Sequence, residues 1–182
     1  QGFGWGSRLG VDLPGEAAGF LPTKNWRDND RPTPWRLGDT YHLSIGQGDI
    51  EVTPLQVASA FSAIANNGTL YQPQLAVSVN RPDGSILRTF PKKVIVEKIA
   101  STSTIRAVQQ GLREGVLSGS SRSLQSLPVA AAGKTGTAQF GRDGKTHSWY
   151  SAYAPYDDPE IVVTVIVEAG GEGNAAALPI AK

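Results

Sequence analysis

Apolar residues recur at helical spacing in two stretches of the chain. In residues 53–66 they repeat every three or four positions, Thr53 can cap the first turn, and Pro54 suits the first helical position, where its missing N–H is not needed. Residues 103–117 repeat in the same way, through Ile105, Val108, Leu112 and Val116. We therefore predict helices over 53–66 and 103–117.

Other segments have the apolar runs that are typical of strands. Residues 74–90 hold two such runs on either side of Pro82-Asp83-Gly84, which predicts a β-hairpin on the surface. In the last third of the chain, residues 129–139, 149–154 and 161–168 read as strands. Residues 129–168 are thus expected to form a three-strand meander, and helices followed by an antiparallel sheet indicate the α+β class.

The first fifty residues are interrupted throughout by Gly and Pro, so we expect residues 1–50 to be mostly irregular. Their Trp and Leu content argues against disorder, which goes with few aromatic residues and high net charge. The segment is therefore expected to wrap over the core. Within it, the charged run of Asp28, Asp30 and Arg31 is expected to be a solvated loop.

Composition narrows the possible functions. The 182 residues suit one domain, and 17 Lys+Arg against 16 Asp+Glu leave a formal charge of +1, too small for a field that would attract nucleic acid. The chain has no Cys, and neither His42 nor His147 has a partner at metal-ligand spacing. We expect no metal, no cofactor and no nucleic-acid partner. Residues 161–167 form the longest apolar stretch, far short of the ~20 residues that span a bilayer.

Residues 131–139 (AAGKTGTAQ) contain the strongest candidate for chemistry. In a strand, Thr135 and Thr137 face the same way and can bind one carboxylate together. Lys134 supplies a cation, but it faces the opposite side unless the strand twists or bulges. Gly136 has no side chain, so a ligand backbone can lie close to the strand there. This pattern predicts an anion site along a strand edge.

Two other interpretations of the same stretch are open. Gly133-Lys134-Thr135 matches the end of the phosphate-binding motif G-x-x-x-x-G-K-[ST], but Pro128 stands where the first Gly should be and has no N–H to offer a phosphate. Alternatively, the small residues serve only for tight packing of a strand.

Residues 134–137 resemble the K-T-G-T element of penicillin-binding proteins and serine β-lactamases, in which it accompanies S-x-x-K and S-x-N elements. The surrounding sequence extends the likeness, with residues 10–16 (GVDLPGE), 38–39 (GD), 44–48 (SIGQG), 53–56 (TPLQ), 153–155 (YAP) and 158–159 (DP) in order. Together they resemble the transpeptidase domain of class B penicillin-binding proteins over essentially the whole chain. The nearest likeness is to the elongation type, penicillin-binding protein 2.

The resemblance implies a penicillin-binding-protein/serine β-lactamase-like fold, with an antiparallel sheet flanked by helices. It also implies a D,D-transpeptidase that cross-links peptidoglycan. In that family a Ser attacks the D-Ala-D-Ala bond of a stem peptide, forms an acyl-enzyme and passes the acyl group to an amine. β-Lactams trap the same Ser.

The resemblance also assigns roles to individual residues. Lys134 and Thr137 would be catalytic, with the Thr137 N–H as half of the oxyanion hole, and Thr135, Gly136, Thr137 and Gln139 would bind substrate. The implied partners are the D-Ala-D-Ala stem peptide, β-lactams, the remainder of the transpeptidase domain and a cell-shape glycosyltransferase. The implied location is the outer face of the bacterial cytoplasmic membrane.

Two motifs of the family pattern are missing from the expected positions in the chain. No Ser is followed by Lys three residues later, and Ser78-Val79-Asn80 spells S-x-N only inside the predicted hairpin. We therefore expect residues 1–182 to be the C-terminal part of a transpeptidase domain, without the S-x-x-K and S-x-N segments and the final helix. Such a chain should be inactive alone, because an acyl-enzyme needs a nucleophile. Two alternatives are an inactive binding or scaffold fragment, and a relative of β-lactamases or D,D-carboxypeptidases.

Overall fold

The computed structural model describes residues 2–30, 33–141 and 143–182, and it confirms the α+β class. Its centre is an antiparallel sheet of β5 (Ala132–Phe140), β6 (Lys145–Ala154) and β7 (Ile161–Val167), in the order β5-β6-β7. This is the meander expected over 129–168. Because β6 lies in the middle, the outer edge of β5 is free of strand partners in the sheet.

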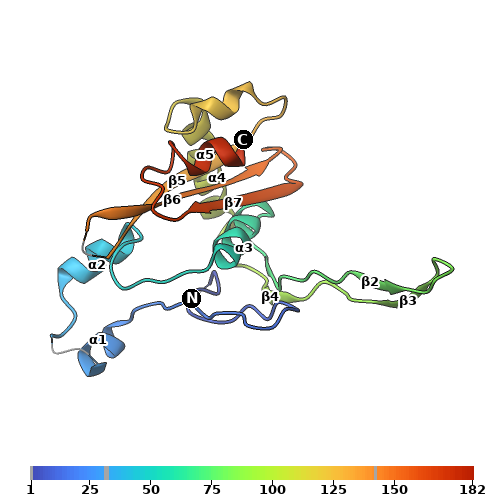
Figure 1. Cartoon of the computed structure of the whole chain (residues 1–182), viewed down its shortest axis with the longest axis horizontal. Helices are drawn as coiled ribbons and strands as arrows, with labels where there is room; N and C mark the ends of the chain where they lie inside the picture. The colour runs from blue at the N-terminus through green and yellow to red at the C-terminus, as the bar shows by residue number, and fades with distance from the viewer. Residues whose placement is uncertain (1, 31–32, 142) are drawn as a thin grey trace.

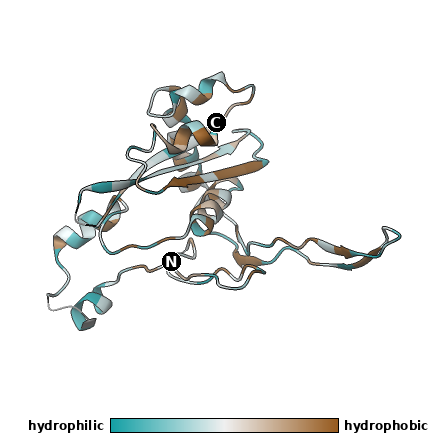
Figure 2. Ribbon diagram, viewed as in Figure 1, coloured by the Kyte–Doolittle hydropathy of each residue, from teal (hydrophilic) through white to brown (hydrophobic). Residues whose placement is uncertain are grey.

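The two faces of the sheet carry different helices (Figure 1). Helix α3 (Pro54–Ala65) lies against one face and the short α5 (Ala177–Ala181) against the other. Side chains alternate along β6, so the buried Tyr150 packs in the cluster with Leu178 of α5, whereas Tyr153 packs with Ala65 of α3. Strand β7 is hydrophobic along its length (Figure 2), since both of its faces are covered.

Both predicted long helices are confirmed, with their caps. In α3 the Thr53 hydroxyl accepts the Gln56 N–H at 3.1 Å, and the Gln56 side-chain oxygen accepts the Thr53 N–H at 2.9 Å. Helix α4 (Thr102–Leu117) begins at Ser101, whose hydroxyl accepts the Thr104 N–H at 3.2 Å. A short 3₁₀-helix, η1 (Arg122–Ser126), follows α4 and leads into β5.

The predicted hairpin is an exposed arm that projects away from the body (Figure 1). It consists of β2 (Ser78–Asn80) and β3 (Ile86–Thr89), and every residue of both strands is exposed. At its base lies a pairing that the sequence analysis missed, between β1 (Leu70–Tyr71) and β4 (Val94–Val96). The Asp12 carboxylate accepts the N–H groups of Leu75 and Ala76 there, which lowers the pKa of Asp12.

The expectation that residues 1–50 are mostly irregular is confirmed for the described part of the segment, although it also holds two short helices that were not predicted. The segment contains helices α1 (Lys24–Asp30) and α2 (Leu37–Ser44), which form between the prolines rather than through them. Asp28 and Asp30 therefore belong to a helix and not to a loop. Arg31 lies outside the described residues, so the loop expected at that position stays a prediction.

The buried side-chain amide of Gln56 attaches the first segment to helix α3. Gln56 of α3 is 1% exposed and its Nε2 donates to two carbonyls of the segment, Ser7 O at 2.9 Å and Ala18 O at 2.7 Å. The Glu16 carboxylate holds the same segment by accepting the N–H groups of Leu9 and Gly10. A Gly- and Pro-rich stretch thus gains order from side-chain bonds instead of backbone ladders.

Near the end of the described chain lies a short helix, α5, of five residues. Its first residue, Ala177, donates its N–H to the hydroxyl of Ser148 in β6 at 3.0 Å. The absence of the family's long final helix stays a prediction. None of the helices in the described ranges combines the length and apolar character needed to cross a membrane.

Candidate functional site

A cavity of about 780 Å³ opens between β5, α3 and the loop after α2. Trp149 and Ser151 of β6 form part of its wall, opposite Val57 and Phe61 of α3. The residues that line it from β5 are Lys134, Thr135, Gly136, Thr137, Ala138, Gln139 and Phe140. All of the site residues predicted from the sequence thus border this single space.

The outer edge of β5 presents backbone groups toward the cavity. The Thr135 carbonyl accepts a bond from Lys134 Nζ at 2.8 Å, and the Thr137 carbonyl accepts one from Gln47 Nε2 at 3.0 Å. In an antiparallel strand the N–H and C=O of a residue point to the same side. The Thr137 N–H therefore also points away from β6, at the outer edge of β5.

Lys134 and the two threonines leave the strand on opposite faces, as the alternation predicted. Thr135 is paired with Tyr150, which packs on the α5 side, whereas Lys134 is paired with Ser151, which lines the cavity. The ammonium nevertheless reaches the edge, because Lys134 Nζ bends to the Thr135 carbonyl. The Lys134 ammonium and the hydroxyls of Thr135 and Thr137 therefore lie along the same strand edge, although the side chains leave β5 on opposite faces of the sheet.

Both threonine hydroxyls already have partners. Thr135 Oγ1 lies 2.9 Å from the hydroxyl of Ser120, in the loop after α4. Thr137 Oγ1 donates to Glu172 Oε2 at 3.1 Å and accepts the Gly173 N–H at 3.3 Å. A ligand carboxylate must therefore share or replace these bonds.

The glycines of β5 are explained first by packing inside the protein. A side chain at Gly136 would place its Cβ 3.1 Å from that of Trp149, and one at Gly133 would collide with the Tyr150 hydroxyl. The expectation that Gly136 serves mainly to admit a ligand backbone is therefore too narrow. The tight-packing interpretation is correct for these two positions, and it coexists with the open edge.

Gly133-Lys134-Thr135 lies inside β5, in extended backbone, and does not form a loop. The interpretation of this stretch as a phosphate-binding loop is therefore wrong. Gln139 is exposed near the end of β5 and lines the cavity. Within the described ranges, its side chain has no hydrogen bond.

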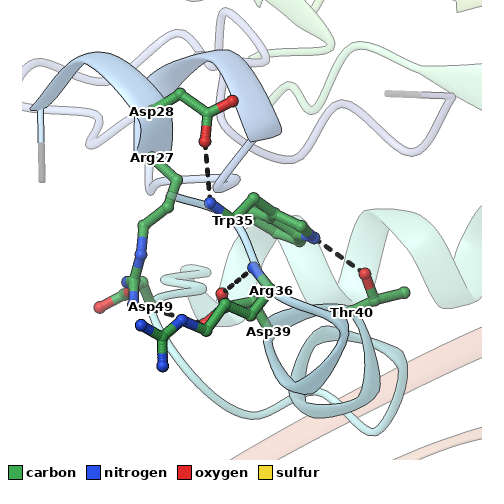
Figure 3. Close-up of polar contacts among 7 residues, drawn as sticks. All are labelled: Arg27, Asp28, Trp35, Arg36, Asp39, Thr40 and Asp49. Carbon is green, nitrogen blue, oxygen red and sulfur yellow. Dashed lines mark hydrogen bonds and ion pairs between the residues drawn. The ribbon is translucent and has the colours of Figure 1, made fainter. Parts of the chain in front are cut away.

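A network in the first segment holds the loop that carries Gln47 (Figure 3). Arg27 of α1 bridges Asp39 of α2 at 3.4 Å and Asp49 at 3.0 Å, two residues beyond Gln47. Asp28 accepts the Trp35 N–H at 2.8 Å, which joins α1 to the turn before α2. The network thus joins α1 and α2 to Asp49, two residues beyond the Gln47 side chain that contacts β5.

Sequence reasoning missed Ser120, Glu172 and Gln47. Each lies 15 to 90 positions from its partner in β5 and belongs to a loop without periodicity. The only signal was the position of Gln47 inside the SIGQG motif. Across the three described ranges, no group of three His, Cys, Asp or Glu side chains could hold a metal ion.

Burial raises the pKa of two tyrosines of β6 that lie near the site. It raises the pKa of Tyr150, which lies beneath Thr135 and Gly133, and an interaction with the Ser121 hydroxyl opposes the shift. It also raises the pKa of Tyr153 to about 12, with the Tyr156 and Asp157 charges adding to the effect. Tyrosines are neutral at about pH 7 in any case, and the charged side chains with bonds to β5 at this edge are Lys134 and Glu172.

Known proteins share this architecture. Residues 1–182 match the family described as the penicillin binding protein transpeptidase domain. The peptidoglycan D,D-transpeptidase MrdA of Haemophilus influenzae is 32% identical over 199 residues, which cover 99% of this chain and 30% of that protein. The chain therefore spans about a third of the length of such relatives.

Solved structures agree. Penicillin-binding protein PBP2 of Helicobacter pylori, in complex with MreC, superposes with a TM-score of 0.78 at 31% identity, over 96% of this chain and 31% of that one. Penicillin-binding protein A of M. tuberculosis, as its penicillin G acyl-enzyme, superposes with a TM-score of 0.75 at 27% identity, over 95% of this chain and 39% of that one. The chain belongs to the penicillin-binding protein transpeptidase family, in the type of PBP2 (MrdA).

Proposed function

We propose that this chain forms the substrate-binding part of a peptidoglycan D,D-transpeptidase. The observation that carries the proposal is the outer edge of β5, where the Lys134 ammonium, the two threonine hydroxyls and the outward Thr137 N–H border one cavity. These are the groups that an acyl-transfer site needs for a terminal carboxylate and a developing oxyanion.

Each group has one role in the proposal. The hydroxyls of Thr135 and Thr137 donate to the C-terminal carboxylate of a D-alanyl-D-alanine stem peptide, or to the carboxylate of a β-lactam. The Thr137 N–H donates to the oxyanion of the tetrahedral intermediate. Lys134 adds positive potential at the edge, and Gly136 and Gln139 complete the binding strand. One oxyanion donor contributes roughly 3–4 kcal/mol to transition-state stabilisation in enzymes where it has been removed.

The nucleophile is proposed to come from outside these 182 residues, because no Ser in them is followed by Lys at the third position. The relatives are about three times longer than the matched region, which leaves room for such a segment. The chain alone would then bind substrate without forming an acyl-enzyme. Its place of action would be the outer face of the cytoplasmic membrane, with a cell-shape glycosyltransferase or an MreC-like protein as partner.

Labelling with a fluorescent penicillin tests this proposal. The chain should remain unlabelled alone and become covalently labelled when produced with the S-x-x-K and S-x-N region that the family carries ahead of it. In the labelled protein, Thr135→Val should slow labelling roughly 10–100-fold, because a hydrogen bond to a charged group is lost. Thr146→Val, on the neighbouring strand β6, is the matched control and should label at the original rate.

Two results would count against the proposal. Absence of labelling under every complementation would favour an inactive scaffold. Labelling that is quickly released to water, with no transfer to an acceptor amine, would favour a β-lactamase or carboxypeptidase.

A further inference from the structure

Glu172 places a carboxylate on the hydroxyl that is proposed to bind the substrate's own carboxylate. Its Oε2 accepts the Thr137 hydroxyl proton at 3.1 Å, and Glu172 itself is exposed. The same hydroxyl accepts the Gly173 N–H at 3.3 Å. Since a hydroxyl has one proton, Thr137 cannot donate to a second carboxylate while it donates to Glu172.

The position of Glu172 is set by its backbone. Its carbonyl accepts the Ser148 hydroxyl at 2.9 Å and the Ala175 N–H at 3.0 Å. The next residue, Gly173, is buried directly against the sheet, where a Cβ would lie 2.7 Å from the Trp149 carbonyl. The turn that carries Glu172 therefore lies flat over β5 and β6, with the carboxylate beside the strand edge.

We propose that Glu172 is a specificity-determining residue of the carboxylate subsite, which weakens the binding of ligands with a free terminal carboxylate relative to neutral analogues. This inference rests on the proposed function, because it uses Thr137 as a ligand for the substrate carboxylate. Two effects act together. Glu172 holds the one proton that the incoming carboxylate needs, and its negative charge repels that carboxylate.

The size of the charge effect follows from Coulomb's law. Two unit charges about 4 Å apart in water interact by roughly 1 kcal/mol, which corresponds to about fivefold in affinity. Removal of the Glu172 charge should therefore tighten the binding of an anionic ligand by roughly three- to tenfold at low salt. A ligand whose terminal carboxylate is an amide should gain much less. A merely structural role of Glu172 would not change the ratio between the two ligands.

The test uses N-acetyl-D-alanyl-D-alanine and its C-terminal amide, with binding to the 182-residue chain followed by NMR titration. Glu172→Gln retains the size and an acceptor oxygen but removes the charge, and Glu172→Ala removes both. Glu168→Gln is the matched control, since Glu168 is exposed at the end of β7 and its carboxylate has no hydrogen bond in the described part of the chain. Both Glu172 variants should bind the acid more tightly, while the control should match the original chain.

Each other outcome overturns the inference. The inference is wrong if Glu172→Gln binds the acid with the same affinity as the original chain, or more weakly. It is also wrong if the substitution increases the affinity for the acid and for the amide by the same factor. Absence of acid binding by every chain would also overturn the inference, because no carboxylate subsite would then exist. Penicillin labelling of the complemented protein keeps the two proposals apart. Labelling that proceeds at the same rate in the original protein and in its Glu172→Gln variant would refute this inference and leave the transpeptidase intact.

Discussion

Burial of Tyr153 makes the stability of the protein decrease in the alkaline pH range. The side chain is 1% exposed and its hydroxyl has no hydrogen-bond partner in the described part of the chain. Its pKa of about 12 in the folded state exceeds that of an unfolded tyrosine, near 10. Between these values the unfolded state has lost the proton and the folded state retains it. Stability must therefore fall as pH rises through this window, and it is unaffected by this group below about pH 9.

We expect Tyr153→Phe to flatten part of this decline. Between about pH 9 and pH 12, Tyr153 contributes a decrease on the order of 2 kcal/mol in the free energy of unfolding, and the variant lacks this decrease. The pKa of Tyr150 is also raised, so Tyr150 accounts for some of the slope that remains. Urea unfolding at several pH values measures the effect. Tyr71→Phe, at a tyrosine that is 39% exposed, is the control. An unchanged pH slope in Tyr153→Phe would contradict the assignment.

The approach of α4 to β5 depends on a glycine contact. A Cβ at Gly115 would lie 2.9 Å from the Gly133 carbonyl, whereas one at Gly111, a turn earlier in the same helix, would meet nothing within 4 Å. The edge of β5 near Ala131 is held by the same helix, since Arg113 Nη1 donates to the Ala131 carbonyl at 2.7 Å. The helix thus covers the first part of the strand edge and leaves the part from Lys134 onward open.

Two Gly→Ala changes in α4 should have opposite signs. Gly111→Ala should stabilise the protein by up to about 1 kcal/mol, because alanine is the better helix former. Gly115→Ala should destabilise it by about 1–3 kcal/mol, since the added methyl pushes α4 away from β5. Chemical denaturation of the two variants measures the difference. Equal gains in both would mean that α4 and β5 are not in close contact.

The first segment and the body of the fold are joined through Gln56. Its side-chain amide bonds to Thr53, Ser7 and Ala18, and the Trp5 indole N–H donates to the backbone carbonyl of Gln56 at 3.4 Å. The same segment also contains Arg27, which pairs with Asp49 (Figure 3), and Gln47, which bonds to the Thr137 carbonyl of β5.

Gln56→Glu should detach that segment. The change replaces the donor by a carboxylate that faces two carbonyls, at a cost of about 2–4 kcal/mol, because buried acceptors lose their partner. Limited proteolysis should then cut within residues 1–50 first. The matched control is Gln110→Glu, at an exposed position of α4. Similar cleavage in both variants would show that Gln56 does not hold the segment.

The elements that could be predicted from the sequence are those with local signals. Thr53 and Pro54 mark the start of α3, apolar spacing predicts α4, and the K-T-G-T residues predict a strand with two hydroxyls on one side. These features need only neighbours within about four positions, so they can be read without a fold. The helices α1 and α2 were missed because they are short and lie among prolines, and β1 because two residues carry no period.

The surroundings of the candidate strand, in contrast, follow from the folded arrangement of distant segments. The partners of its hydroxyls and carbonyls, namely Ser120, Gln47 and Glu172, come from loops brought together by folding. The crowding of Gly136 by Trp149 likewise depends on strand register. A hydrogen bond forms between atoms about 3 Å apart, whatever their separation along the chain, and sequence periodicity carries no information about that distance.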